Sequence, residues 1–168
     1  MDMYRLLHPS IAVLISTVSK EGKQNVCAVA WISPVCKDPP IFSFALHKGH
    51  LSTEYIKQTG EIVVSIPGED LIQTVWCCGT NSGKDVDKVK KCDLKLLPSS
   101  TVKAPRVEGA MGWIEAKIEQ ELLAGDHIIF VAKATHWETN NKGSVWDKSP
   151  LMHLGGNNFC IFEKTIKA

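Results

Sequence analysis

The sequence predicts a mainly β (α+β) protein in which antiparallel strands form a closed or nearly closed barrel. Two observations lead to this prediction. Short apolar runs with strand-like patterns recur along the chain and are separated by turns that contain Gly or Pro. The segments with helical character are few and short, and they fall in the connections between those runs. About six or seven strands with helical insertions are typical of an antiparallel barrel.

The first half of the chain supplies four of the expected strands. Residues 11–19 and 25–32 are nearly continuous apolar runs on either side of the polar segment KEGKQ, so we expect them to pair as a hairpin. Further strands are expected at 41–46 and 61–66.

Three short helices are expected in the connections. The first covers residues 51–60, with Ser52 or Thr53 as its N-cap candidate and Gly60 as its C-cap candidate. The other two are expected at 70–79 and 84–91.

The clearest strand is expected at 113–123, because its apolar and charged residues alternate. The apolar positions are Ile114, Ala116, Ile118 and Leu122, and the charged positions are Glu115, Lys117, Glu119 and Glu121. A period of two places all four charges on one face of a strand. Residues 127–138 are the natural antiparallel partner across the AGD turn, and two short strands are expected at 151–154 and 159–164.

The composition fits one globular domain over residues 1–168. Hydrophobic residues make up 44% and charged residues 22%, and the formal net charge is +1. This balance gives no electrostatic footprint for nucleic acid. The chain shows no signal peptide pattern and no apolar run near the roughly 18 residues of a membrane span. We therefore expect a soluble cytoplasmic protein that does not bind membranes.

The cysteines are expected to be reduced structural thiols. Their spacing matches no secreted disulfide framework, and an intracellular protein keeps its thiols reduced. A disulfide between the neighbours Cys77 and Cys78 would be strained, and Cys is often buried for packing alone. The six cysteines are Cys27, Cys36, Cys77, Cys78, Cys92 and Cys160.

Most signatures of catalysis are absent from the sequence. It contains no G-x-S-x-G, no phosphate loop ending in G-K-[ST], no H-E-x-x-H and no C-x-x-C. Hydrolase, nucleotide triphosphatase and thioredoxin functions lose most of their support. No close Cys or His pair has the spacing of zinc ligands, so no metal site is expected.

Three weaker features suggest an anionic ligand. Lys48, Ser52 and Thr53 lie near the start of a predicted helix, where a phosphate would be favoured, although a plain helix cap explains them too. Lys84 and Lys88 are four residues apart on one face of a predicted helix, where they would reach an anion or an electron-rich ring edge, although a charged helix facing solvent explains them too. His127, after the turn at 125–126, lies at the barrel rim as a ligand contact or a structural residue.

The order of the motifs resembles one protein family. NVCAVAWISP is followed by DPPIFSFAL, then by KGHLSTEYIKQTGEIVVSIP, CGTNSGKDVDK and ELLAGDHIIF. Together these segments resemble the flavin reductase-like family of FMN-binding split barrels, from about residue 5 to 164. The flavoredoxin and archaeal-type ferric reductase branch is the most similar. The chain differs from many relatives at His50, where they have Arg, and at Ser65, where they have Asn.

The resemblance implies a cofactor site for FMN. The strand from Asn25 to Trp31 and the following turn would wrap the isoalloxazine ring, while Lys48, Ser52 and Thr53 would hold the phosphate. His127 and Lys88 would tune the flavin without acting as covalent catalysts, and Phe159 would help to close the site. The implied FMN contacts are Asn25, Ala28, Val29, Ala30, Trp31, Ser33, Lys48, Ser52, Thr53, Lys84, Lys88, His127 and Phe159.

Three functions follow from that resemblance. The favoured one is an FMN-dependent oxidoreductase that takes electrons from NAD(P)H and passes them to free flavin, a ferric chelate or another acceptor. The second is a flavoredoxin-like electron carrier that is reduced by a protein partner, and the third is a flavin-binding module without turnover. No sequence-encoded nucleophile is needed, because a bound flavin supplies the redox chemistry. The family also implies a homodimer.

Overall fold

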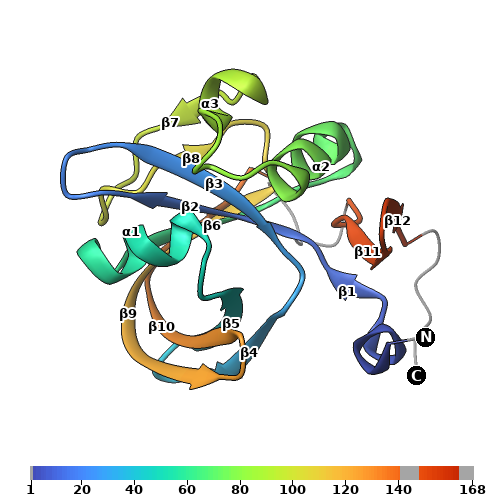
Figure 1. The fold of residues 1–168 in the computed structure, drawn as a ribbon, viewed down its shortest axis with the longest axis horizontal. Helices are drawn as coiled ribbons and strands as arrows, with labels where there is room; N and C mark the ends of the chain where they lie inside the picture. The colour runs from blue at the N-terminus through green and yellow to red at the C-terminus, as the bar shows by residue number, and fades with distance from the viewer. Residues whose placement is uncertain (1, 141–147, 163–168) are drawn as a thin grey trace.

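Seven strands form one antiparallel sheet in the computed structural model, which describes residues 2–140 and 148–162 (Figure 1). Their order across the sheet is β3-β2-β6-β9-β10-β5-β4. The strands are β2 (Val13–Val18), β3 (Gln24–Val29), β4 (Ile32–Cys36), β5 (Ile41–His47), β6 (Glu61–Ile66), β9 (Gly112–Ala124) and β10 (His127–Thr139).

The sheet curls into a barrel because its two edge strands are consecutive in the chain. Only Ala30 and Trp31 separate β3 from β4, although these strands lie at opposite edges. Three residue steps span at most about 11 Å, whereas the edges of a flat sheet with six strand spacings would lie roughly 29 Å apart. Among the described residues no hydrogen-bonded ladder joins β3 to β4, so the barrel is split there. The predicted fold class is confirmed.

The interior of the barrel is a continuous apolar core. It includes Ile15, Phe44, Ile62 and Phe130, all nearly inaccessible to solvent. Helix α1 (Leu51–Thr59) packs Ile56 into this core and ends at Gly60, whose φ of 67° is left-handed. Gly60 is therefore confirmed as the C-cap.

The other face of β2 and β3 is covered by two helices. α2 (Ile72–Thr80) follows the short 3-10 helix η2 (Glu69–Leu71), and α3 (Lys88–Lys91) lies next to it (Figure 1). A second cluster of buried residues, which includes Leu14, Val26, Val75 and Cys78, fills the space beneath them. Since β2 is covered on both faces, all six of its residues are buried.

A terminal lobe lies beside the barrel and joins the two ends of the described chain (Figure 1). We define it as the 3-10 helix η1 (Met3–Leu7), β1 (Ser10–Ile11), β11 (Met152–Gly155) and β12 (Asn158–Cys160). β1, β11 and β12 form a three-stranded sheet, and a further two-stranded sheet pairs β7 (Leu96–Leu97) with β8 (Arg106–Val107).

Several predicted strand boundaries were wrong. The expected strand 11–19 is divided, because β1 pairs with β11 in the lobe and β2 pairs within the barrel. β4 was not predicted, since its Ser-Pro sequence indicated a turn. Pro34 is tolerated there because β4 is an edge strand, where a missing N–H disrupts little. Of the expected strand 159–164, residues 163–164 lie outside the described residues.

A β-bulge changes the expected alternation in β9. The register with β10 shifts between Ile118 and Gln120, which leaves Glu119 as an extra residue. The strand therefore changes face after this point, and Leu122 is 63% exposed instead of facing the core. The prediction that all four charges lie on one face was wrong, because a bulge cannot be identified from alternation alone.

The third predicted helix is shorter than expected. Asp87 is the N-cap of α3, and its carboxylate accepts hydrogen bonds from the N–H groups of Val89 and Lys90. Lys84 therefore precedes the helix, and it does not share a helix face with Lys88 as predicted.

The prediction that every cysteine is reduced was wrong. Cys77 on α2 and Cys92 just after α3 form a disulfide across 15 residues of sequence. The sequence drew attention to the pair Cys77 and Cys78, but these neighbours point differently, and Cys78 is a buried free thiol. Burial raises the pKa of Cys78 to about 11, so it stays protonated at neutral pH.

We expect the disulfide to stabilise the fold mainly by restricting the unfolded chain. Closing a loop of this length contributes about 3 kcal/mol. The double variant C77S/C92S should therefore unfold at a lower urea concentration by that amount, whereas C36S, which changes an exposed free thiol, should not. A dithiol reductant should reproduce the loss in the parent protein and have no effect on C77S/C92S. Equal stability of parent and double variant would contradict the role given to this bond.

A buried ion pair fixes the segment that precedes β8. The Glu115 carboxylate on β9 is fully buried and accepts hydrogen bonds from the Arg106 guanidinium, from the Ser100 N–H at 2.8 Å and from the Thr101 N–H at 2.6 Å. Burial alone would raise the pKa of Glu115, but these hydrogen bonds outweigh it and lower the pKa to about 2. The carboxylate is thus a stabilising anion.

Acid should remove this contribution. The pKa of Glu115 is lower in the folded state than its ordinary value of 4.5, so the stabilisation is present above pH 4.5 and is lost as the pH falls towards 2. A shift of this size corresponds to about 3 kcal/mol. Glu115→Gln should lower the free energy of unfolding at pH 7 and flatten its decline below pH 4.5, while Glu119→Gln at the exposed bulge should do neither. Urea unfolding at several pH values measures this, and unchanged acid sensitivity of Glu115→Gln would refute it.

Candidate functional site

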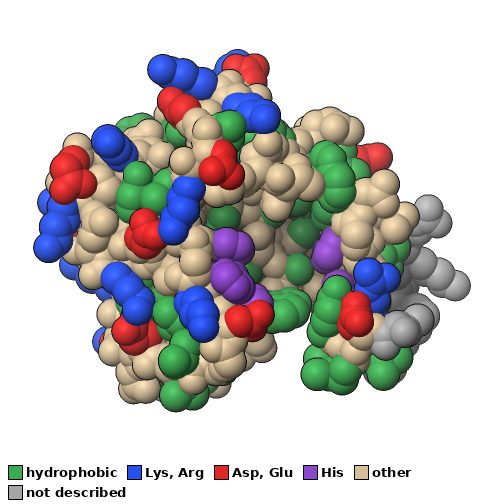
Figure 2. All heavy atoms as spheres, in the orientation of Figure 1, with side chains coloured by type: hydrophobic (Ala, Val, Ile, Leu, Met, Phe, Trp, Pro, Cys, Tyr) green, Lys and Arg blue, Asp and Glu red, His purple; other side chains and the backbone are tan. Residues whose placement is uncertain are grey.

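The main candidate site is a pocket between the barrel and the terminal lobe. Its volume is about 360 Å³. The corner between β3 and β4, Ala28–Trp31, forms part of its wall. Figure 2 shows histidine side chains on both sides of the hollow at this position. The barrel contributes His47, His50 and His127, and the lobe contributes Tyr4, His8 and His153.

The aromatic rings of the pocket contact one another in sequence. Trp31 lies 4.7 Å from His127 and 5.8 Å from Tyr4, measured between ring centroids. Tyr4 in turn lies 5.9 Å from His8, and His8 lies 5.1 Å from His153. The rings therefore link the barrel wall to the lobe wall. Such a surface suits a planar ligand, because aromatic rings stack or meet edge to face at these separations.

The register of β5 and β10 places two of the histidines together. His47, the last residue of β5, is the direct partner of His127, the first residue of β10. The Lys48 N–H donates to the Asp126 carbonyl at 3.0 Å, which fixes the adjoining loop. The Asp126 carboxylate bonds His127 Nδ1 at 2.7 Å, and this hydrogen bond lowers the pKa of Asp126. His127 is thereby held in one orientation.

The beginning of α1 differs from its prediction. His50, not Ser52 or Thr53, is the N-cap, and it makes no side-chain capping hydrogen bond. Ser52 and Thr53 are buried in the first turn, where Ser52 Oγ accepts from Asn25 Nδ2 at 2.8 Å and Thr53 Oγ1 donates to the His47 carbonyl at 3.0 Å. Their hydroxyls therefore connect α1 to β3 and β5.

His50 lies at the N-terminal end of α1, where no side chain caps the helix. Burial lowers the pKa of His50, and the charges of His47, Lys88, His127 and Lys84 lower it further. A positive potential at this end of the helix is consistent with a site for an anion. Lys48 is exposed beside it.

Three of the predicted residues line a different pocket. Asn25, Lys84 and Lys88 border a space of about 880 Å³ along α1 and the segment before α3. Lys84 forms an ion pair with Glu54 of α1. Lys88 Nζ donates to the Cys78 carbonyl at 2.7 Å and to the Val26 carbonyl at 3.2 Å, and burial lowers its pKa. In this structure Lys88 therefore links β3 to α2.

Gly83 packs this second pocket's wall against the start of α1. A Cβ atom on Gly83 would lie 2.4 Å from Asn25 Oδ1 and 2.9 Å from the Leu51 side chain. Only a glycine therefore fits against the hydrogen bond that joins Asn25 to Ser52. The segment between α2 and α3 is packed directly on the start of α1.

The remaining predicted residues lie at the edges. Ser33 is exposed on β4 and lines a neighbouring hollow of about 650 Å³ together with Trp31. Phe159 packs against the His153 ring at 5.2 Å and so supports the lobe wall. The structure thus brings together Ala28, Val29, Ala30, Trp31 and His127 in one pocket.

Sequence reasoning missed three residues of the lobe wall. Tyr4, His8 and His153 lie far from the motifs in the chain, and only the pairing of β1 with β11 brings them to the site. The available signal was that histidines recur near strands and turns. This signal does not show which of these histidines lie close together in the fold.

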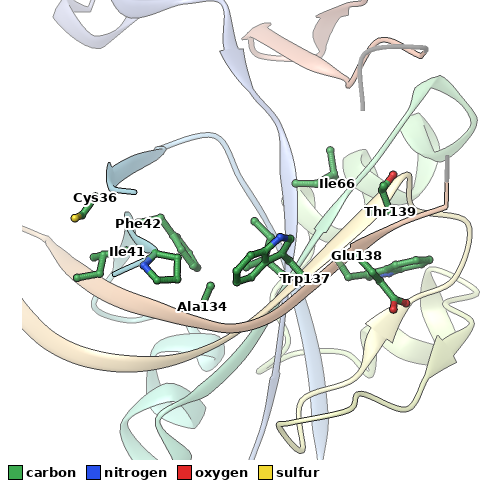
Figure 3. Close-up of a pocket in the computed structure, with 12 residues that line it drawn as sticks. Cys36, Ile41, Phe42, Ile66, Ala134, Trp137, Glu138 and Thr139 are labelled. Atoms are coloured by element: carbon green, nitrogen blue, oxygen red, sulfur yellow. The ribbon is translucent and has the colours of Figure 1, made fainter. Parts of the chain in front are cut away.

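An apolar pocket of about 500 Å³ lies at the opposite ends of β5 and β10. Figure 3 shows Trp137 in its middle, between Phe42 and Ala134 on one side and Glu138 and Thr139 on the other. Glu138 is bound to Arg106 and lies near His136, so the pocket offers little free polar chemistry. It contains none of the predicted site residues.

Two negative findings apply to residues 2–140 and 148–162. No three His, Cys, Asp or Glu side chains among them are grouped as ligands of a metal ion. No helix in this part of the chain is long and apolar enough to cross a lipid bilayer.

Comparison with known families and proteins agrees with the fold. A family described as flavin reductase like domain matches residues 3–159. An uncharacterized protein of Archaeoglobus fulgidus is 33% identical over 135 residues, which cover 80% of this chain and 75% of that protein.

Two solved structures superpose over nearly the whole chain. The FMN-binding domain of a flavin reductases-like enzyme from Shewanella baltica OS155 has 27% identity and a TM-score of 0.85, covering 98% of this chain and 92% of that one. The flavoredoxin of Desulfovibrio vulgaris (Miyazaki F) has 20% identity and a TM-score of 0.87, covering 96% and 91%. The flavoredoxin shows a shared fold.

Proposed function

The chain belongs to the flavin reductase-like family, and we propose that it is an FMN-dependent oxidoreductase that takes electrons from NAD(P)H and passes them to free flavin, a ferric chelate or another acceptor. One observation carries this proposal. Of the residues that the family resemblance assigns to the isoalloxazine ring, Ala28–Trp31 and His127 line one ring-walled pocket, whereas Asn25 and Ser33 line other spaces. The FMN-binding relative from Shewanella baltica supports the choice of cofactor.

The size and the polar groups of the pocket support the proposal that it binds FMN. Its volume of about 360 Å³ is within the usual range for ligand pockets, about 300–1,000 Å³. Trp31 is 43% exposed, which leaves part of a large aromatic surface free for stacking. His153 Nδ1 is a buried polar atom without a hydrogen-bond partner in the described residues, and a polar ring edge would provide one.

The N-terminal end of α1 would suit the phosphate group of FMN. Helix α1 has nine residues and no side-chain cap, so its first N–H groups favour an anion. Lys48 and His50 would meet the phosphate from outside the helix. Ser52 and Thr53 would act mainly by fixing the first turn, since their hydroxyls already bond Asn25 and the His47 carbonyl.

The bound flavin would supply the transfer of electrons singly or in pairs. The side chains of the protein would orient the ligand and handle protons. Because His127 Nδ1 bonds Asp126, its Nε2 is the nitrogen available to hold or release a proton at the pocket. Lys88 would tune the site indirectly, by holding the Val26 carbonyl and thus the path of β3.

A homodimer is part of the same proposal. The terminal lobe exposes apolar side chains that a monomer would leave in water, including Met3 and Leu6, each 74% exposed, and Leu7, 73% exposed. A second copy of the chain covering them would also shield the adjacent pocket.

The second candidate is an electron carrier. The similarity of its fold to a flavoredoxin favours this alternative. A carrier would bind FMN in the same pocket but would receive electrons from a protein partner.

The spectrum of the purified protein distinguishes these functions. We expect bound flavin absorbing near 450 nm, about the usual band of an oxidised flavin, and bleaching within seconds after NADH or NADPH is added without oxygen. Flavin that bleaches only with a reduced protein partner would favour the carrier. A protein that takes up no FMN would refute both.

Gly83→Ala should weaken FMN binding without unfolding the protein. The added methyl group would displace Asn25 from Ser52 and so disturb the first turn of α1. Restoring the turn on binding FMN would cost about as much as one such hydrogen bond, about 1 kcal/mol, which corresponds to a Kd increase of about fivefold. Titration of the protein with FMN, followed by fluorescence, measures this.

Lys90→Ala is the matched control, because Lys90 lies in the same region but is 87% exposed. Equal Kd values for Gly83→Ala and the parent protein would argue against a phosphate site at the start of α1.

A further inference from the structure

The Cys77–Cys92 disulfide is partly exposed to solvent. It joins α2 to the residue that follows α3, and both of its cysteines are only half-buried. The two helices lie next to each other over β3 (Figure 1). Cys27 and Cys78, by contrast, are buried free thiols. A thiolate from solution can therefore reach this bond while the barrel stays folded.

The groups around the bond favour attack at Cys92. Thiol–disulfide exchange begins when a thiolate attacks one sulfur and displaces the other as a thiolate. Asn81 Nδ2 donates to Cys77 Sγ at 3.8 Å, so it would stabilise the negative charge on Cys77 when that sulfur leaves. Lys91 and Lys95 are exposed on either side of Cys92 in the sequence, and their positive charges favour the approach of a thiolate.

The disulfide closes a loop that packs against the start of α1. We call residues 81–91, which lie between α2 and Cys92, the clamp segment. Gly83 of this segment packs directly on the Asn25 side chain, and Asn25 Nδ2 in turn donates to Ser52 Oγ at 2.8 Å. The clamp segment therefore helps to hold the helix end at which we place the phosphate of FMN.

The same segment supports the wall that we propose binds the flavin ring. The buried Lys88 Nζ donates to the Val26 carbonyl of β3 and to the Cys78 carbonyl of α2. Ala28 lies two residues further along β3 and lines the proposed flavin pocket. A clamp segment that leaves its place would therefore free β3 just before the ring wall, as well as the first turn of α1.

The other interactions of the clamp segment are weak or lie within it. Helix α3 has only four residues, and so short a helix is not stable alone. The ion pair between Lys84 and Glu54 is half-exposed, so it contributes little. The cap that Asp87 provides for α3 moves with the segment. The disulfide is thus the covalent restraint on which the seating of the segment depends.

We propose that the Cys77–Cys92 disulfide is an exchange site for a dithiol reductant, and that its reduction releases the clamp segment and weakens the binding of FMN. The effect on FMN rests on the proposed function. A thiolate of the dithiol attacks Cys92 Sγ, the bond between the two cysteines breaks, and its electron pair leaves on Cys77 Sγ. The second thiol of the reductant then displaces Cys92 from the mixed disulfide. The reductant ends as a disulfide, and its two protons and two electrons are left on the two cysteine thiols.

Reduction should raise the Kd for FMN. If the clamp segment is seated in about one tenth of the reduced molecules, the apparent Kd rises about tenfold. The oxidised protein and protein reduced with dithiothreitol, without denaturant, are both alkylated with iodoacetamide, so that exposed free thiols are modified equally. Both samples are then titrated with FMN, and mass spectrometry verifies that the reduced sample carries two more alkyl groups. Equal Kd values, or a disulfide that dithiothreitol reduces only in denaturant, would overturn the proposal.

Variants assign the effect to this disulfide. C77S/C92S should have the raised Kd of the reduced protein and should not respond to dithiothreitol. C36S is the matched control, because it removes an exposed free thiol, and it should keep both the Kd of the parent protein and its response to the reductant. If the double variant does not fold, the reduced parent protein decides, with circular dichroism to show that it is folded. A folded double variant with the Kd of the parent protein would contradict the proposal.

Hydrogen exchange in the protein without FMN separates this proposal from the proposed function. Amides of the clamp segment, such as the Val86 N–H that bonds the Ser82 carbonyl, should exchange at least about tenfold faster after reduction, because the segment opens locally. Amides of β9 should not change. Unchanged exchange in the clamp segment would overturn the proposal even if FMN binds. If the protein takes up no FMN, the proposed function fails, and faster exchange on reduction would still support the dithiol site.

Discussion

The short connection between β3 and β4 determines the architecture of this protein. Two residues, Ala30 and Trp31, join strands at opposite edges of a seven-stranded sheet. Because so short a segment cannot cross a flat sheet, the sheet must curl until its edges meet. Within the part of the chain that the structure describes, no hydrogen-bonded ladder joins β3 to β4, and Trp31 of the connection lines the adjacent pocket. The core, the split in the barrel and the position of the pocket all depend on this constraint.

The rest of the site is assembled around the same corner. The register of β5 with β10 brings His47 beside His127, and the Lys48 N–H fixes the turn before His127. The terminal lobe closes the pocket from the other side through the pairing of β1 with β11. Residues from both ends of the chain and from the middle therefore meet at one pocket. The sequence next to each of these residues does little to fix its position. The apolar pocket near Trp137 has a comparable volume but lacks this convergence of polar groups.

The sequence predicted the barrel and the corner because both have strong local signals. Alternation identified β9 up to Ile118, and the run ending at Trp31, with the resemblance, predicted the pocket wall that we propose binds the flavin ring. What it missed depends on contacts between distant residues. The bulge at Glu119 is a matter of pairing, the Cys77–Cys92 disulfide needs the packing of two helices, and His8 meets His153 only through the lobe sheet. Ser52 and Thr53 were correctly placed at the start of α1, but burial of their hydroxyls follows from tertiary structure.

The central claim is that the corner of β3 and β4 holds the flavin ring. The most direct test is a crystal structure of the protein grown with FMN. We predict electron density for the isoalloxazine against Ala28–Trp31 and near His127, with the phosphate at the start of α1 beside Lys48 and His50. Density for the flavin in the apolar pocket around Trp137, or on any surface away from the histidines, would contradict the account.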